Sequence, residues 1–289
     1  MKLRLLLLPL LLTAIPALAG LPFDTVFRGR DRFDQLVQLA SEENWRTLPI
    51  GERLCTVGRA QVGTPYRSYT LEIDDHIEAP SVDLNGLDCW TFFETSLAFA
   101  RMLDEPPQGW TPQTMLHYVE LDRYRNGHCT GQYLSRLHYL EDWLYDNQRR
   151  GLMKDMTREF GGVRVPHQAD EMTEGWREYR YLRNNPSLLS PLREMEERVQ
   201  DMPLYEIPKY RVPRVEARMQ DGDIICIVSR EDGLYSTAHV GMAYRDDLGT
   251  LHFMHASSIY GRVVIDDRLS DYLDRHPTDA GIMVARPLR

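Results

Sequence analysis

The chain has 289 residues, of which 43% are hydrophobic, 27% charged and 10% aromatic, and this apolar content excludes a disordered protein. Its 34 Lys and Arg residues are outnumbered by 43 Asp and Glu residues, for a formal net charge of −9. No Lys/Arg-rich stripe is present, which argues against nucleic-acid binding, because a phosphate-tracking surface needs a basic face. Enzymes, binding proteins and structural proteins remain open.

The first residues predict a secretory signal peptide. A cationic start precedes an apolar run over residues 5–12, a proline at position 16 and the small-residue pattern Ala-Leu-Ala at 17–19. This segment is shorter than the roughly 20 apolar residues that span a membrane. We therefore expect residues 1–19 to be cleaved off between Ala19 and Gly20. The mature chain would then be periplasmic or secreted, with no membrane anchor.

The spacing of apolar residues predicts helices in the first third of the mature chain. One apolar face recurs over residues 32–45, and a second helix is predicted over 50–62 and ends before Pro65. After a long loop, a strong helix begins at Asp88, whose carboxylate can cap the free amides of the first turn. Apolar and small residues over 92–100 give this helix a broad face to bury.

Residues 104–213 form a polar section that we expect to be a helical insertion or lobe. The acidic pairs at 141–142 and 196–197 are expected on solvated helix faces. The predicted parts, in chain order, are a helix from Thr111-Pro112, a helix over 135–150, a helix over 190–200 and a proline-rich connector over 203–213.

Beyond this section the sequence pattern becomes that of strands. Short runs rich in β-branched residues alternate with turn-forming segments, which predicts an antiparallel meander. Helices followed by strands indicate an α+β fold. We expect one domain over residues 20–289, in which the helix after Asp88 packs on the sheet. The strands are predicted over residues 223–229, 238–244, 251–256, 263–266 and 282–286.

Four cysteines in an exported chain raise the question of disulfides. Cys226 lies in a run of isoleucine and valine and is expected to be a small buried hydrophobe. Cys55 and Cys129 are left as a possible bridge, which the sequence does not decide. Cys89 stands apart because it follows a helix-capping aspartate.

Cys89 is the candidate nucleophile. A thiol in the first turn of a helix meets unsatisfied amides, which favour the thiolate and lower the pKa. His239 is the candidate base, and His255 on the next strand can hydrogen-bond the far nitrogen of His239 and fix its tautomer. Gly241 shares a face with His239 and is expected to let the helix approach the sheet. These residue types are those of a cysteine hydrolase.

The same residues belong to a longer ordered pattern that resembles the NlpC-type papain-fold cell-wall cysteine hydrolases. Residues 87–94 and 135–139 resemble, more narrowly, the N-acetylmuramoyl-L-alanine amidase-like branch. The resemblance runs from about residue 57 to the end of the chain. The pattern consists of Gly63-Thr64-Pro65-Tyr66, Asp88-Cys89, His239-Val240-Gly241 and Phe253-Met254-His255-Ala256-Ser257.

The resemblance implies a papain-like fold and a catalytic triad of Cys89, His239 and His255, with no cofactor and no metal. The hydroxyl of Tyr66 and the backbone amide of Cys89 would stabilise the oxyanion. The implied reaction cleaves the amide between the (anhydro)muramoyl lactyl group and L-alanine in peptidoglycan or its soluble muropeptides. Trp90 stands where the wider family commonly has serine, so we expect Trp90 to alter the substrate pocket.

Several alternatives stay open. The wider family more often cuts γ-D-glutamyl-diaminopimelate bonds, and both substrates carry carboxylates. An acidic protein then needs a local cationic pocket, for which Arg136 and His138 are candidates. The same cysteine and histidines could instead ligate zinc in a hydrolase, and a non-catalytic wall-binding module or a transferase also remains possible. The sequence does not indicate the oligomeric state.

Overall fold

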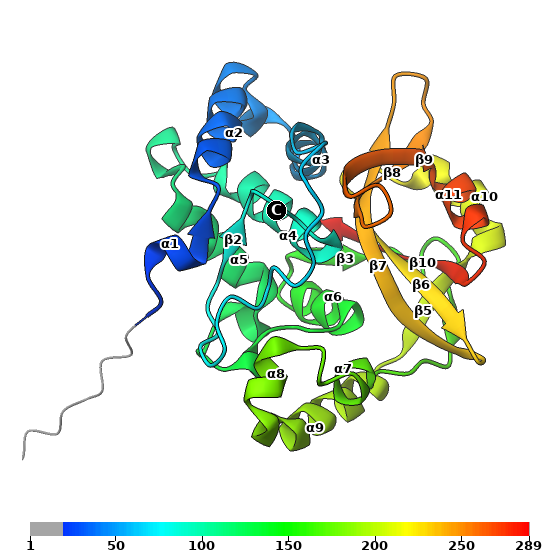
Figure 1. Cartoon of the computed structure of the whole chain (residues 1–289). Coiled ribbons are helices and arrows are strands. Elements are labelled where there is room, and N and C mark those ends of the chain that lie inside the picture. Colours follow the sequence, from blue (N-terminus) through cyan, green and yellow to red (C-terminus); the bar gives the residue numbers. More distant parts are fainter. Residues whose placement is uncertain (1–19, 289) are drawn as a thin grey trace, which may run out of the picture.

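The computed structural model describes residues 20–288 of the chain, so the predicted signal peptide lies outside the described residues. Helices form one half of the molecule and a strongly twisted sheet forms the other (Figure 1). This arrangement confirms the α+β fold class. Among the residues described, no helix has both the length and the apolar character that crossing a membrane requires.

Eleven α-helices are present in the described part of the chain. Those in the N-terminal half surround α4, and helices α7–α9 gather below them (Figure 1). The helices are α1 (Phe23–Val26), α2 (Arg30–Glu42), α3 (Ile50–Ala60), α4 (Cys89–Met102), α5 (Pro112–Arg123), α6 (Leu140–Arg149), α7 (Glu171–Glu174), α8 (Arg180–Asn184), α9 (Leu189–Gln200), α10 (Val212–Val215) and α11 (Leu269–Arg275).

The strands of the main sheet pair in the order β4-β5-β10-β6-β7-β8-β9, and β3 also pairs with β10. Each of these pairs is antiparallel. A separate parallel pair joins β1 and β2 near the N-terminus. The strands are β1 (Phe27–Arg28), β2 (Val82–Asp83), β3 (Met153–Asp155), β4 (Val163–Val165), β5 (Leu204–Pro208), β6 (Ile224–Glu231), β7 (Leu234–Arg245), β8 (Leu251–Ser257), β9 (Arg262–Arg268) and β10 (Asp279–Pro287).

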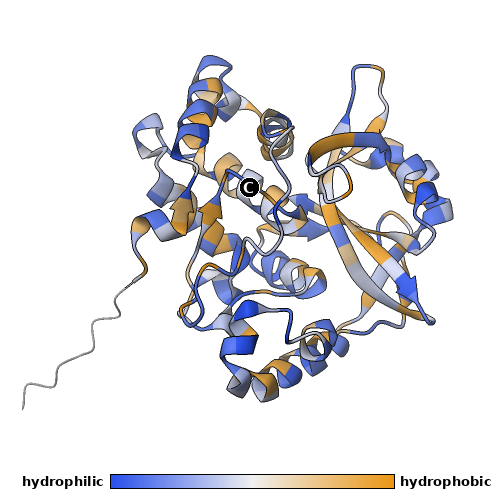
Figure 2. Ribbon diagram, viewed as in Figure 1, coloured by the Kyte–Doolittle hydropathy of each residue, from blue (hydrophilic) through white to orange (hydrophobic). Residues whose placement is uncertain are grey.

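Helix α4 is the centre of the helical half. Twelve of its fourteen residues are buried, and it packs between α3, α5 and the strands β7 and β8. The central strands are predominantly hydrophobic, whereas the outer helices mix hydrophilic and hydrophobic turns (Figure 2). The predicted packing of this helix on the sheet is therefore confirmed. Its first residue, Cys89, lies at the junction of the two halves.

Several predictions in the middle section are wrong. The helix predicted from residue 135 begins only at Leu140, because Arg136 is buried and its backbone pairs with Tyr124 in an isolated β-bridge. The predicted connector contains strand β5, which lies between β4 and β10. Residues 104–213 thus contribute strands as well as helices. A small core of their own joins α7, α8 and α9.

Three of the four acidic residues expected on solvated faces are buried. Asp142 is fully buried and forms an ion pair with Arg125. Glu141 accepts a hydrogen bond from Thr237 at 3.0 Å, and Glu196 accepts one from Tyr139 at 2.7 Å. A pair of neighbouring acids in a sequence does not reveal the partners that tertiary packing supplies, and these partners make the burial tolerable.

The sheet also departs from a simple meander. Strands β6 to β9 follow one another as predicted, but helix α11 intervenes and β10 returns to pair with β6 on the far side.

The cysteines are free, so the possible bridge between Cys55 and Cys129 is not formed. Cys55 is buried in α3, and the Cys129 thiol donates a hydrogen bond to a backbone carbonyl. Cys226 is fully buried in β6, as predicted.

Candidate active site

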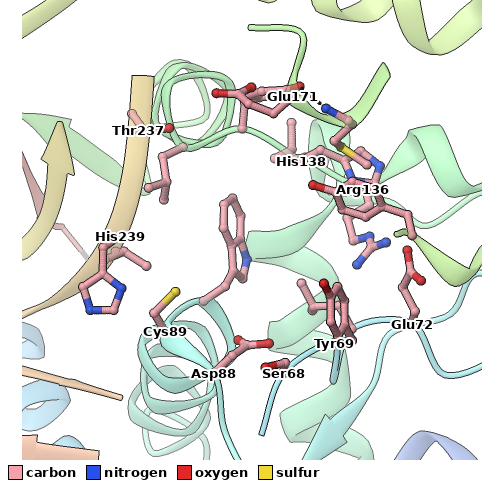
Figure 3. Close-up of a pocket in the computed structure, with 18 of the residues that line it drawn as sticks. Ser68, Tyr69, Glu72, Asp88, Cys89, Arg136, His138, Glu171, Thr237 and His239 are labelled. Atoms are coloured by element: carbon pink, nitrogen blue, oxygen red, sulfur yellow. Dashed lines mark hydrogen bonds between the residues drawn. The ribbon is translucent and has the colours of Figure 1, made fainter. Parts of the chain in front are cut away.

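A cavity of about 450 Å³ opens between the N-terminus of α4, strand β7 and the α7–α8 region. We name it the Trp90 cavity. Cys89 and His239 lie at one end, while Arg136 and Glu72 lie across the cavity from them (Figure 3). Six of the seven side chains predicted for the site line this cavity, namely Tyr66, Cys89, Trp90, Arg136, His138 and His239. The seventh, His255, lies behind His239.

The first turn of α4 is held by a capping box. The Asp88 carboxylate accepts a hydrogen bond from the Thr91 amide at 2.7 Å, and the Thr91 hydroxyl accepts one from the Asp88 amide at 2.9 Å. The hydroxyl of Thr70 also donates to Asp88, at 3.0 Å. These reciprocal bonds satisfy helix-terminal amides. They leave the half-buried Cys89 thiol fixed at the helix start, facing the cavity (Figure 3).

The Cys89 thiol is neutral, in contrast to the expectation from its helix position. Burial, and then the Asp88 carboxylate, raise the pKa of Cys89 to about 12, although nearby backbone amides oppose the shift. Burial also lowers the pKa of His239 to about 3, with smaller contributions from His255 and His276. At neutral pH the pair is therefore a thiol and an uncharged imidazole.

A chain of hydrogen bonds runs away from the thiol through the imidazoles. Nε2 of His239 lies 2.7 Å from Nδ1 of His255, which leaves Nδ1 of His239 for the thiol side. Nε2 of His255 lies 3.3 Å from a carboxylate oxygen of Asp266. Arg275 donates to the other oxygen of that carboxylate at 2.7 Å. Such a series fixes the tautomer and orientation of a catalytic base.

Asp266 is a site residue that sequence reasoning missed. It lies near the end of β9, where the register with β8 shifts between His252 and Met254. His255 pairs with Val264, and Asp266, two residues further along β9, shares the face of Val264 and is a diagonal neighbour of His255. The register between β8 and β9 is known only from the folded sheet, so sequence reasoning did not identify this neighbour.

The position of His239 also depends on a bulge. The register between β6 and β7 shifts so that Ile227 pairs with His239 and Val228 with Thr237, which leaves Ala238 as an extra residue. Bulges redirect the side chains of a strand and are frequent next to active sites. Here the bulge directly precedes the candidate base.

The role expected for Gly241 is wrong. A Cβ atom at this position would lie 2.5 Å from the Met254 carbonyl oxygen, 2.7 Å from the Phe253 ring and 2.8 Å from Cβ of His255. Gly241 thus makes room for strand β8 and its histidine rather than for the helix. A glycine on a helix does allow a close approach to the sheet: Gly58 of α3, whose added Cβ would meet Met242 of β7 and Met254 of β8.

Tyr66 lies beside the thiol on the loop between α3 and α4. Its backbone amide donates to the Gly261 carbonyl at 2.8 Å, and the residue is half-buried. Burial, and then the nearby Cys89, raise the pKa of the Tyr66 hydroxyl. The hydroxyl therefore keeps its proton and can donate a hydrogen bond into the site.

Trp90 lines the cavity next to the thiol, and buried charges hold it there. Its indole nitrogen donates to Glu94 at 3.2 Å. The other oxygen of Glu94 accepts from Arg123 at 2.6 Å, and both members of this ion pair are almost completely buried. The indole is consequently anchored to the core by a charged group, which favours a fixed orientation.

Arg136 and His138, the residues expected to form a cationic pocket, both line the cavity. Arg136 is only 3% exposed, lies 3.5 Å from Glu78 and stacks on a tyrosine ring. Burial, and then Arg136 itself, hold the pKa of His138 well below its usual range, so His138 is uncharged. Glu72 and Glu171 also line the cavity. Arg136 therefore already has an acidic partner, and carboxylates accompany it along the cavity wall.

The described residues offer no convergent metal site. No group of three or more His, Cys, Asp or Glu side chains between residues 20 and 288 is arranged to hold a metal ion. The nitrogens of His239 and His255 that face each other are hydrogen-bonded at 2.7 Å, so the two rings and Cys89 do not converge on one point as zinc ligands do.

This chain resembles known proteins both in sequence and in structure. Residues 56–282 match the sequence profile of the AmiA-like, N-acetylmuramoyl-L-alanine amidase-like family. None of the curated proteins compared with the chain matches it. The structure of an N-acetylmuramoyl-L-alanine amidase from Bacteroides uniformis is similar, with a TM-score of 0.73 and 28% sequence identity, covering 83% of this chain and 99% of that one.

Two further structures are similar. A protein from Bacteroides fragilis that is named a candidate xylanase has a TM-score of 0.71 and 30% identity over 80% of this chain and 99% of that one. A protein from Legionella pneumophila has a TM-score of 0.67 at 22% identity, over 90% of this chain and 95% of that one, which shows a shared fold. The profile match extends over most of the chain, including the thiol and both histidines. The chain therefore belongs to the AmiA-like family of N-acetylmuramoyl-L-alanine amidase-like proteins.

Proposed function

We propose that this protein is a cysteine amidase that hydrolyses the amide between the lactyl group of (anhydro)muramic acid and L-alanine in peptidoglycan fragments. One observation carries the proposal: in a chain of this family, the Cys89 thiol and the His239 imidazole face the same cavity, with His255 directly behind. We further propose that the fold is of the papain-like NlpC type. The predicted signal peptide would export the enzyme to the periplasm or beyond the cell.

In the proposed first step, His239 acts as a general base. As the Cys89 sulfur bonds to the amide carbon, the thiol proton moves to Nδ1 of His239 and the carbonyl becomes an oxyanion. The neutral resting pair requires this proton transfer to accompany the attack. The Tyr66 hydroxyl and the first amides of α4 would donate hydrogen bonds to the oxyanion.

In the second step the oxyanion collapses and the carbon–nitrogen bond breaks. His239 returns the proton to the departing nitrogen of L-alanine, leaving a thioester on Cys89. Water then attacks the thioester carbon, giving its proton to His239, and the restored thiol takes that proton back. The products are a muramic acid carboxylate and a free peptide. His255 and Asp266 would stabilise the imidazolium between steps.

The test is mass spectrometry of the mature protein incubated with defined anhydromuropeptides, for wild type and Cys89→Ala, with and without a chelator. We expect free peptide beginning with L-alanine from wild type only, unaffected by the chelator. Circular dichroism should show that Cys89→Ala remains folded, because the substitution removes only the sulfur atom from a cavity wall.

Other outcomes would replace the proposal. Cleavage after D-glutamate would make the enzyme a γ-D-glutamyl-diaminopimelate endopeptidase with the same thiol. Loss of cleavage in chelator would indicate a metal hydrolase. Binding of fragments without any cleavage, by a protein shown to be folded, would favour a wall-binding module.

A further inference from the structure

A second cavity lies on the other side of the candidate base. It measures about 360 Å³ and is bounded by the β8–β9 turn, strand β9 and helix α11. His239 lines both this cavity and the Trp90 cavity, whereas His255, Tyr272 and Arg275 line only the second. We name it the Arg275 cavity. A substrate centred on the thiol can therefore extend in two directions.

The positions of the reacting groups distinguish the two directions. Cys89 and Tyr66, which would contact the acyl carbon and its oxygen, line the Trp90 cavity and not the Arg275 cavity. The departing nitrogen must lie next to His239, which protonates it. The acyl half of the substrate thus belongs on the Trp90 side, and the amine half on the side of the Arg275 cavity.

The chemistry of the two cavities agrees with this division. The Trp90 cavity combines aromatic rings with the carboxylates of Glu72 and Glu171, which can stack on a sugar and accept bonds from its hydroxyls. The Arg275 cavity contains an arginine, and exposed Tyr260 lies at its edge. An arginine is suited to binding a carboxylate through paired hydrogen bonds.

Arg275 has capacity for an additional partner. Its side chain is 43% exposed, and one of its two ion pairs is with Asp267, whose side chain is 60% exposed. Exposed pairs of this kind contribute little to stability, so a substrate carboxylate can replace Asp267. The pair with the buried Asp266 can remain in place and hold the guanidinium at the cavity wall.

We propose that the Arg275 cavity binds the departing peptide and that Arg275 recognises a carboxylate on it. This inference rests on the proposed amidase function, in which the leaving group is L-alanine followed by D-glutamate. The nearest carboxylate on that peptide is the α-carboxylate of D-glutamate. Arg275 would then be a specificity residue on the amine side of the scissile bond.

The experiment compares two substrates that differ only in this group, muramoyl-L-alanyl-D-glutamate and muramoyl-L-alanyl-D-isoglutamine. We expect wild type to prefer the carboxylate substrate by about tenfold in kcat/KM, mainly through KM, as a charge-assisted hydrogen bond would give. Arg275→Gln should bring the ratio to about 1, and Arg275→Lys should restore part of it. Arg262→Gln removes an exposed charge from β9 outside the cavity and should keep the wild-type ratio.

The amide substrate separates recognition from a structural effect. If Arg275→Gln lowers kcat/KM equally for both substrates, Arg275 acts only through Asp266 and the inference is overturned. If Arg275→Gln keeps the wild-type activity and the wild-type substrate preference, the inference is also overturned. Cleavage at the lactyl–alanine bond would still support the amidase in that case. If folded wild type cleaves neither substrate, the amidase function and the inference both fail.

Discussion

At the scale of single residues, the site contains a neutral acid–base pair instead of a preformed ion pair. The position of Cys89 at a helix start favours the thiolate, but burial and Asp88 outweigh this effect and raise the pKa of Cys89 to about 12. The same burial lowers the pKa of His239 to about 3. The reactivity of the thiol therefore depends on the proton acceptor beside it.

This pair predicts an unusual pH profile for a thiol enzyme. Because the pKa of His239 is lowered, its basic form persists as the pH falls, and the acidic decline in kcat/KM should lie well below pH 6. Because the pKa of Cys89 is raised, no alkaline titration of the thiol should appear below about pH 10. Steady-state assays from pH 4 to about 10 should therefore give a flat central region.

Alkylation of the thiol gives an independent measurement. The rate of reaction of Cys89 with iodoacetamide should still rise at pH 10, since only the thiolate reacts. Cys129 is the other cysteine that is not fully buried, so the assay should use Cys129→Ser. A plateau in the alkylation rate near pH 7, or an acidic decline in kcat/KM near pH 6.5, would contradict the neutral pair.

At the scale of secondary-structure elements, one strand bulge and one glycine place the histidines. The bulge at Ala238 precedes His239, and the pairing of His255 with Val264 puts Asp266 on the same face of the sheet as His255. Gly241 lets β7 and β8 approach closely enough for the two imidazoles to hydrogen-bond. The geometry of the imidazole pair is thus a property of the sheet.

Gly241→Ala should damage both the fold and the site. Its Cβ would collide with the Met254 carbonyl at 2.5 Å, and a backbone atom cannot move aside as a flexible side chain can. We expect a loss of about 1–3 kcal/mol in the free energy of unfolding, as for other overpacked sites. We also expect kcat/KM to fall by at least about tenfold, because separation of the strands weakens the hydrogen bond between the imidazoles.

Gly233→Ala is the matched control for this substitution. Gly233 lies in the turn between β6 and β7. Its φ is +88°, and no atom lies within 4 Å of an added Cβ. Gly233→Ala should lower the free energy of unfolding by about 1 kcal/mol, because alanine is strained in the left-handed backbone conformation. Its kcat/KM should stay unchanged. Equal activity losses in the two variants would show that Gly241 has no specific role in placing His255.

At the scale of the whole molecule, buried ion pairs join the helices that support the site. Glu94 pairs with Arg123, and Arg101 pairs with Asp122 at 2.9 Å; both pairs link α4 to α5. Arg123 also donates to the Ser81 carbonyl at 3.0 Å, on the segment before α4. The helix that carries the thiol is consequently fixed by charges in the protein interior.

Removal of one partner should be costly. Arg123→Met leaves the Glu94 carboxylate buried without its cation, and we expect the free energy of unfolding to fall by about 3–5 kcal/mol in urea titrations. The double variant Glu94→Gln/Arg123→Met removes both charges and should recover part of this loss.

Arg180→Met is the control for the buried pair. Arg180 and its partner Asp75 are both about half-exposed, so this variant should lose less than about 1 kcal/mol. A similar small loss in Arg123→Met would show that the buried pair contributes no more than a surface pair. If Arg123→Met does not fold, Arg123→Lys should still be measurably less stable than wild type, because lysine cannot reproduce the arginine hydrogen-bond geometry.

Local patterns in the sequence determined the features that depend on neighbours along the chain. The capped start of α4, the helix that follows Thr111 and the strands β6 to β9 were all predicted, because capping residues and apolar periodicity act within a few positions. Cys89, both histidines and Tyr66 were named as candidates from the sequence, with the aid of a family pattern, and the structure brings these four residues together.

Tertiary structure decided everything that depends on distant neighbours. It buried Glu141 and Asp142, turned residues 204–208 into a strand, placed Asp266 behind His255 and compensated the charge of Arg136. It also decided the ionisation of the thiol. Burial is the largest cause of the raised pKa of Cys89, and it depends on packing against segments that are distant in the sequence, as does the exposure of a carboxylate.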